Sequence, residues 1–165
     1  MHRTLYLLIL ICIVSAGCGV YSFTGAHIEG KSIFIHVLEN RARNVEPTLS
    51  PTLTDKIRSR ILSQTGLSPI ANDNADYDLS GTITSYEVTV TATQNTQQAV
   101  KNRLTITVNI AFRNKLNDKT SFEQSFTRFS DFDASKNLQN VQSSLIDDIG
   151  NQLADDIFNK AFVNW

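Results

Sequence analysis

The chain has 165 residues, which is the length of about one domain. Fifteen basic side chains balance 16 acidic ones for a net charge of −1, and this balance argues against a nucleic-acid partner, because phosphate binding needs a basic face. Hydrophobic residues make up 41% of the chain, which is enough for a core. Only two cysteines are present, so a disulfide framework is excluded.

The first 18 residues have the layout of a lipoprotein signal. A basic start at Arg3 is followed by an uncharged apolar run over residues 5–14, too short to cross a membrane as a helix but suited to a signal peptide. Small residues then precede Cys18, as in a bacterial lipobox, although Ser15 stands where leucine is usual. We expect residues 1–17 to be removed and Cys18 to carry membrane-anchoring acyl chains such as palmitate. An ordinary secretory signal is the alternative.

The residue after Cys18 indicates the destination of the protein. In bacterial lipoproteins an aspartate at this position is the usual signal for retention in the inner membrane, and here the residue is Gly19. The sequence therefore favours the outer membrane. We expect residues 18–31 to form a lipidated linker and residues 32–165 to form one folded domain.

A strand and a helix open the predicted domain. Residues 32–38 are β-branched and apolar, which predicts a short strand. Ser50 and Pro51 suit the N-cap and the first position of a helix, and apolar residues then recur at i+4. Gly66 is typical of the residue just after a helix, so a helix is predicted over 51–65.

Three strands come next. The apolar positions of residues 77–91 change phase near Ser85, which predicts a β-bulge there. Residues 103–112 alternate strictly between apolar and polar, which predicts a strand with one buried face. Residues 120–129 return from a turn at 117–118, so these last two strands form a hairpin.

A second helix closes the domain. Apolar residues from Leu138 to Ile157 recur at intervals of three or four, which predicts a long helix ending near Phe162, with Ser135 as its cap. Both helices need a surface on which to bury their apolar faces. We therefore predict an α+β fold of order β-α-β-β-β-α, with two helices packed on one face of a four-stranded, mostly antiparallel sheet. The place of the first strand in the sheet stays open.

The chain has no motif typical of an enzyme. HExxH, GxSxG and glycine-rich phosphate-binding motifs are missing, so we expect neither a catalytic site nor a cofactor. His36 has no accompanying His, Cys or acid cluster, and we interpret it as a strand histidine. Asp131 and Asp133 form a D-x-D pair, but without the rest of a calcium loop we interpret them as capping and turn residues and predict no metal site.

Five short stretches together carry a family resemblance: residues 17–23 (GCGVYSF), 39–41 (ENR), 104–108 (LTITV), 122–126 (FEQSF) and 157–161 (IFNKA). In combination they resemble the LptE family of lipopolysaccharide-assembly lipoproteins. The resemblance covers essentially the whole mature chain. It implies an outer-membrane lipoprotein, on the periplasmic side, that plugs the lumen of a β-barrel partner, LptD, and assists its assembly. It also implies a place in the translocon that inserts lipopolysaccharide, and direct binding of that glycolipid, as proposed for the family.

Four basic residues are the expected lipopolysaccharide contacts. Because a meander reverses direction at each turn, the connections before residue 103 and after residue 129 lie at one end of the sheet. Lys101, Arg103, Arg128 and Lys136 lie at or near these connections, where the resemblance places the family's proposed glycolipid contacts. Arginine can bind phosphate through two hydrogen bonds.

One sheet face is the expected contact with the barrel. Thr105, Thr107 and Asn109 lie on the polar side of their strand and are small and uncharged, which suits a polar barrel lumen. An ordinary solvated sheet face is the alternative for these residues. A structural accessory lipoprotein of another outer-membrane assembly machine is the alternative function, and missing acid/base clusters disfavour an extracytoplasmic enzyme or small-molecule binder.

Overall fold

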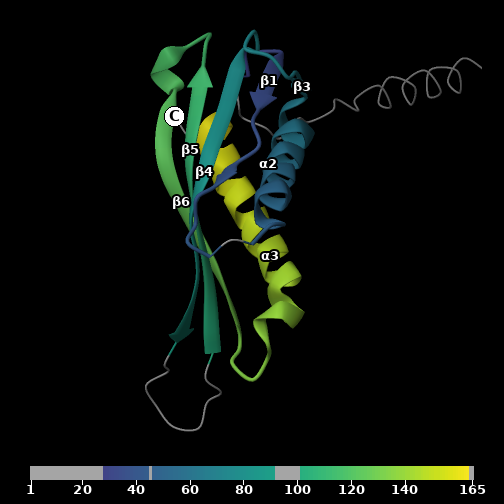
Figure 1. The fold of residues 1–165 in the computed structure, drawn as a ribbon. Helices are drawn as coiled ribbons and strands as arrows, with labels where there is room; N and C mark the ends of the chain where they lie inside the picture. Colours follow the sequence, from purple (N-terminus) through teal and green to yellow (C-terminus); the bar gives the residue numbers. More distant parts are fainter. Residues whose placement is uncertain (1–27, 45, 92–100, 164–165) are drawn as a thin grey trace, which may run out of the picture.

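The computed structural model describes residues 28–44, 46–91 and 101–163. Figure 1 shows a twisted sheet with both helices on the same side of it. The elements, in chain order, are β1 (Ser32–Ile35), β2 (Glu39–Asn40), α2 (Leu49–Thr65), β3 (Ser68–Pro69), β4 (Tyr77–Thr91), β5 (Lys101–Asn114), the 3-10 turn η1 (Asp118–Thr120), β6 (Phe122–Asp133), α3 (Leu138–Phe158) and the π-helical turn η2 (Asn159–Val163).

The sheet is mixed. Its order is β3-β1-β4-β5-β6, and β2 also pairs with β4. The three long strands form an antiparallel meander, whereas β1, β2 and β3 make only parallel pairs. The predicted α+β class with two helices on one face is confirmed, and the first strand lies beside β4. The predicted number of four strands is wrong, because β2 and β3 have two residues each and two residues carry no periodic signal.

The predicted bulge in β4 is confirmed. The register between β4 and β5 shifts between Ile83 and Ser85, so that Thr84 is the extra residue. Leu79 and Ile83 are fully buried before the bulge, and Tyr86 is buried after it. The extra residue therefore keeps the apolar side chains of both halves of β4 on the core side.

Both helix starts differ from the sequence-based predictions. Thr48 occupies the N-cap position of α2, and the Ser50 hydroxyl instead donates to the carbonyl oxygen of Leu38 at 2.5 Å. Asn137 caps α3, where its Oδ1 accepts from the amide of Gln139 at 3.1 Å. Ser135, the predicted cap, donates its hydroxyl to Asp133 Oδ1 at 2.7 Å.

The helix ends agree better with the sequence. Gly66 follows α2 with a φ of +68°, a left-handed conformation in which glycine carries no steric penalty, as predicted. α3 ends at Phe158 and continues as η2 to Val163, so its buried stripe ends at Phe162. None of the helices in the described part of the chain is long and apolar enough to cross a membrane.

The core is a single layer between the sheet and the helices. Five inward-facing residues of β5 are at most 1% exposed: Leu104, Ile106, Val108, Ile110 and Phe112. The α2 residues packed in the same cluster are Leu49, Leu53, Ile57 and Ile61, and those of α3 include Ile149, Leu153 and Ile157. No described element covers the other face of the sheet, and that bare face holds the first candidate site.

Candidate functional site

The bare face of the sheet is polar, and hydrogen bonds between side chains join its neighbouring strands. Thr105, Thr107 and Asn109 lie on this face of β5, as their alternation with buried residues requires. Thr107 Oγ1 lies 3.0 Å from Thr127 Oγ1 on β6, and Asn109 Nδ2 donates to Glu123 Oε1 at 2.8 Å. These bonds satisfy side chains within the sheet, so the face is a preformed polar surface.

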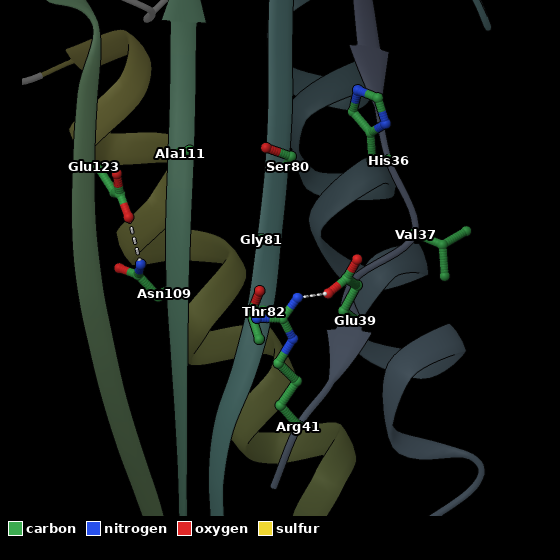
Figure 2. A pocket seen from close by; sticks show the side chains of 10 residues that line it. All are labelled: His36, Val37, Glu39, Arg41, Ser80, Gly81, Thr82, Asn109, Ala111 and Glu123. Atoms are coloured by element: carbon green, nitrogen blue, oxygen red, sulfur yellow. Dashed lines mark hydrogen bonds and ion pairs between the residues drawn. The ribbon is translucent and has the colours of Figure 1, made fainter.

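A shallow depression of about 340 Å³ lies on this face, where the chain passes from β1 to β2 (Figure 2). Arg41 Nη2 lies 2.6 Å from Glu39 Oε2 in an ion pair, and His36 Nε2 lies 3.0 Å from Asp78 Oδ2. Glu123, which also lines the depression, accepts its hydrogen bond from Asn109. No group of His, Cys, Asp and Glu side chains that could hold a metal ion occurs within the described residues. The depression is therefore a polar surface that contains one ion pair.

Gly81 lies behind this depression, where a side chain would point into the core. A Cβ on Gly81 would lie 2.6 Å from Ile110 Cδ1, 2.8 Å from the carbonyl oxygen of Asn109 and 2.8 Å from Leu38 Cδ2. The missing side chain leaves room for Leu38 to enter the core as the chain crosses from β1 to β2. The amide of Leu38 is satisfied there by the buried hydroxyl of Thr54, at 3.0 Å.

The second candidate site is the end of the sheet where β5 begins. Lys101 lies opposite Asp133 in the β5–β6 ladder, and Arg103 lies opposite Asp131. The amide of Lys136 donates to the carbonyl oxygen of Asp133 at 3.0 Å, which places Lys136 in the turn just beyond β6. The structure therefore brings Lys101, Arg103 and Lys136 together, as the meander predicted.

Aspartates neutralise part of this positive charge. Arg103 donates to Asp131 through Nε at 2.7 Å and Nη2 at 3.0 Å, and these bonds lower the pKa of Asp131 and raise the pKa of Arg103. The Arg103 guanidinium also lies 3.6 Å from the ring centre of Phe129. Lys101 and Lys136 form no ion pair within the part of the chain that the structure describes. Of the three cations at this end, these two are the more accessible to an anionic ligand, although both lie near the Asp133 carboxylate.

The D-x-D pair is explained by these contacts. Asp131 holds Arg103, and Asp133 accepts hydrogen bonds from the amide and hydroxyl of Ser135, which lower the pKa of Asp133. Asp133 is the last residue of β6, and its carboxylate holds the turn that follows, which confirms its interpretation as a turn residue. Asp131 lies within β6 and forms an ion pair, because β6 continues to Asp133 rather than ending at residue 129.

Arg128 does not lie at this end of the sheet, which corrects the sequence-based placement. It lies opposite Ile106 in the middle of the hairpin, because β6 extends beyond its predicted end. Its guanidinium donates to the two carboxylate oxygens of Asp156 on α3 at 2.5 and 2.6 Å, and these bonds raise the pKa of Arg128. Arg128 therefore joins the sheet to a helix.

Sequence reasoning missed the depression and its charged pair. Glu39 and Arg41 are two residues apart, which in an extended chain places both side chains on one face. That spacing was a usable signal. A weaker signal was Phe129, an aromatic residue on the polar side of β6. It is 47% exposed and contacts Arg103.

A family model for lipopolysaccharide assembly, LptE, matches residues 30–161. The chain belongs to the LptE family. The match runs from before β1 into η2, nearly the whole described domain, and it confirms the resemblance seen in the sequence. LptE-family proteins are non-enzymatic accessory lipoproteins of the outer membrane. This LptE-family protein is therefore assigned to lipopolysaccharide assembly.

Solved structures share the fold at low sequence identity. The hypothetical protein CT253 from Chlamydia trachomatis aligns with a TM-score of 0.54 and 9% identity, over 82% of this chain and 99% of that chain. A neuraminyllactose-binding hemagglutinin homolog from Helicobacter pylori gives 0.51 and 11%, over 80% and 83%. A minor lipoprotein from Acinetobacter baumannii gives 0.46 and 15%, over 82% and 98%. The first two similarities show that the fold is shared and show nothing more. No curated protein sequence matches the chain.

Proposed function

We propose that this LptE-family protein is a lipid-anchored part of the machine that inserts lipopolysaccharide into the outer membrane, where it occupies the lumen of an LptD-type β-barrel and assists its assembly. The observation that carries the proposal is the bare sheet face. That face is rich in hydroxyl groups, and at its depression Arg41 pairs with Glu39 while Glu123 accepts a hydrogen bond from Asn109. The interior of such barrels is polar, so a hydroxyl-rich polar face suits a barrel wall.

Photo-crosslinking in cells tests the contact with the barrel. A photoreactive residue in place of Thr107, in the middle of the bare face, should give an adduct with a large barrel protein. Asn151, which is exposed on α3, is the matched position on the helix side. An adduct from Thr107 alone marks the sheet face as the contact, and adducts from both positions indicate a domain enclosed on all sides. The absence of an adduct from Thr107 contradicts the proposal.

We also propose that Cys18 becomes the acylated first residue of the mature protein. The support is the apolar run of residues 5–14 followed by small residues before Cys18; these residues lie outside the described part of the chain. Intact-mass analysis of membrane-extracted protein should show a chain that begins at Cys18 and carries acyl groups. Cys18→Ala should leave an unprocessed protein, and an unmodified, soluble wild-type protein would contradict the proposal.

The proposed lipopolysaccharide contacts are Lys101, Arg103 and Lys136. Their support is their position together at one end of the sheet and the affinity of cations for the phosphates of lipid A. Lys101 and Lys136 form the primary pair in this proposal, because Arg103 must first exchange the carboxylate of Asp131 for a phosphate. Arg128 is the weakest of the four sequence-based candidates, since Asp156 already binds its guanidinium.

A further inference from the structure

The sheet ends at β6 with a long unpaired edge. β6 pairs with β5 from Phe122 to Asp133 without a register shift, and no described strand pairs with its other side. Its sequence, FEQSFTRFSDFD, contains no proline and no lysine, and of its four charged residues Arg128 is turned toward α3 and bound by Asp156. The opposite edge differs, because β3 has only two residues and one of them is Pro69.

The hydrogen bonds made by β4 allow us to infer which main-chain groups of β6 face its free edge. The carbonyl oxygen of Leu79 accepts from the amide of His36, and that of Ile83 accepts from the amide of Arg41, both at 2.9 Å. The main-chain groups of these odd-numbered residues of β4 therefore point toward β1 and β2. The even-numbered residues between them, such as Ser80, bond with β5. Main-chain groups alternate between the two sides of a strand.

The same alternation carries across the sheet to β6. Ser80 lies opposite Ala111, so the odd residues of β5 bond with β4 and its even residues bond with β6. Val108 lies opposite Phe126, which makes the even residues of β6 the ones that bond with β5. The main-chain groups that face the free edge belong to the odd residues Glu123, Ser125, Thr127, Phe129 and Asp131.

We propose that β6 receives an added strand, supplied by an extended segment of the LptD-type barrel protein, which pairs with residues 123–131. The identity of this partner rests on the proposed function. The side chains of Glu123, Ser125 and Thr127 lie on the bare face, so an added strand would extend that face with its own side chains. Main-chain bonds supply the affinity in such strand addition, and the hydroxyl-rich neighbours fit small polar side chains.

A second copy of this chain fits the edge less well. Consider two antiparallel copies of β6 related by a two-fold axis. Odd residues of one copy then lie opposite odd residues of the other, because only the odd residues direct main-chain groups toward the free edge. In the two registers that use nearly the whole strand, Glu123 lies opposite either Asp131 or Asp133 of the copy. Like charges directly opposite each other destabilise a sheet. The charge pattern of β6 therefore favours a different chain as the occupant.

Amide hydrogen exchange resolved to single residues tests this pairing. The full-length lipoprotein is compared alone, in detergent, and in complex with the barrel co-purified from outer membranes. We expect the amides of Ser125, Thr127 and Phe129 to exchange fast in the lipoprotein alone and roughly tenfold or more slowly in the complex. The amides of Gln124 and Phe126 are the internal controls, because they bond with β5 in both samples.

Each other outcome overturns the inference in a distinguishable way. Fast exchange of the odd amides within an intact complex leaves the proposed function standing and removes the added strand. Protection in the lipoprotein alone shows that another part of this chain covers the edge, or a second copy if the protection grows with concentration. Failure to recover any complex with a barrel contradicts the proposed function, and the inference falls with it.

Two variants of Thr127 distinguish the contribution of the main chain to complex formation from that of the side chain. Thr127→Pro removes an outward-facing amide, a change that edge strands tolerate, and should lower recovery of the complex roughly tenfold. Thr127→Val removes the hydroxyl that contacts Thr107 but keeps the amide, and should lower recovery less than twofold. Equal losses from both variants would assign the contact to the side-chain face alone.

Discussion

Two hydrogen bonds join Arg128 on β6 to Asp156 on α3, although 28 positions separate these residues in the sequence. The pair fixes the last strand of the sheet to the last helix. Both side chains are partly exposed, at 45% and 26%, so water weakens the attraction between them. The contact accounts for a cation that otherwise resembles a ligand-binding residue.

Replacement of Arg128 should therefore affect stability and leave glycolipid binding intact. Arg128→Gln should lower the free energy of unfolding by about 0.5–1 kcal/mol, because two charge-assisted hydrogen bonds are lost at a partly solvated site. Urea denaturation of the single variants and of the double variant with Asp156→Asn gives the coupling between the two residues. Loss of lipopolysaccharide affinity at unchanged stability would contradict this assignment.

A side chain at Gly81 should disturb the packing of β4 against β5 and Leu38. In Gly81→Ala the new Cβ would meet the carbonyl oxygen of Asn109, which belongs to the main chain and cannot move cheaply. We expect a loss of about 1–3 kcal/mol, measured by thermal or urea unfolding. Ser80→Ala, at the neighbouring position on the bare face, is the control and should cost less than about 0.5 kcal/mol.

Acid should release the contact between Asp76 and the start of β1. The amide of Lys31 and the hydroxyl of Ser32 donate to Asp76 Oδ2 at 2.8 and 3.0 Å, and these bonds lower the pKa of Asp76. A carboxyl whose pKa is lowered by folding stabilises the fold above its unfolded pKa of about 3.9, and this contribution disappears as the pH falls through the folded pKa.

Asp76→Asn should therefore be less stable than the wild type at pH 7, by about 1 kcal/mol for this partly exposed group. The difference should narrow toward pH 2.5. Urea midpoints at both pH values measure it, and the other carboxyls with lowered pKa, such as Glu46 and Asp131, cancel because both proteins carry them. A difference that is the same at both pH values would show that the charge of Asp76 contributes nothing.

Charge reversal at Lys101 and Lys136 should weaken lipopolysaccharide binding. Two exposed cations contribute about 1 kcal/mol together, so the double change to Glu should raise the dissociation constant roughly fivefold. Arg113 and Lys119, at the opposite end of β5 and in η1, provide the matched control with the same change in net charge. Equal losses from both pairs would mean that only diffuse charge attracts the glycolipid.

The sequence predicted those parts of the fold whose signal is local and repeated. The alternation along β5 predicted its buried face, and the phase change near Ser85 predicted the bulge. The caps were missed because Ser50 and Ser135 have nearby acceptors, Leu38 O and Asp133 Oδ1, that compete with the helix ends. Helix-cap chemistry depends on which partner is nearer, and the sequence does not record that distance.

The candidate site was predicted less completely for a related reason. The meander brought Lys101, Arg103 and Lys136 to one end, because strand reversal follows from turn positions alone. It could not show that Asp131 neutralises Arg103, since that depends on the register of β5 against β6. Arg128 was misplaced because polar residues after 129 ended the apolar pattern while the main-chain pairing continued to Asp133.

The bulge at Thr84 divides the β4–β5 hairpin into two segments with different freedom to change length. Before it, β1 pairs with residues 77–79 of β4 and β2 pairs with Thr82 and Ile83; after it, from Glu87 to Thr91, no described strand lies on the outer side of β4. Residues added singly to this later segment would reverse its apolar and polar faces, whereas residues added in pairs to each strand would not. Within this segment, the length can therefore change without reversal of the faces only in steps of two residues, or about 7 Å. An insertion of one residue would need a second bulge to compensate.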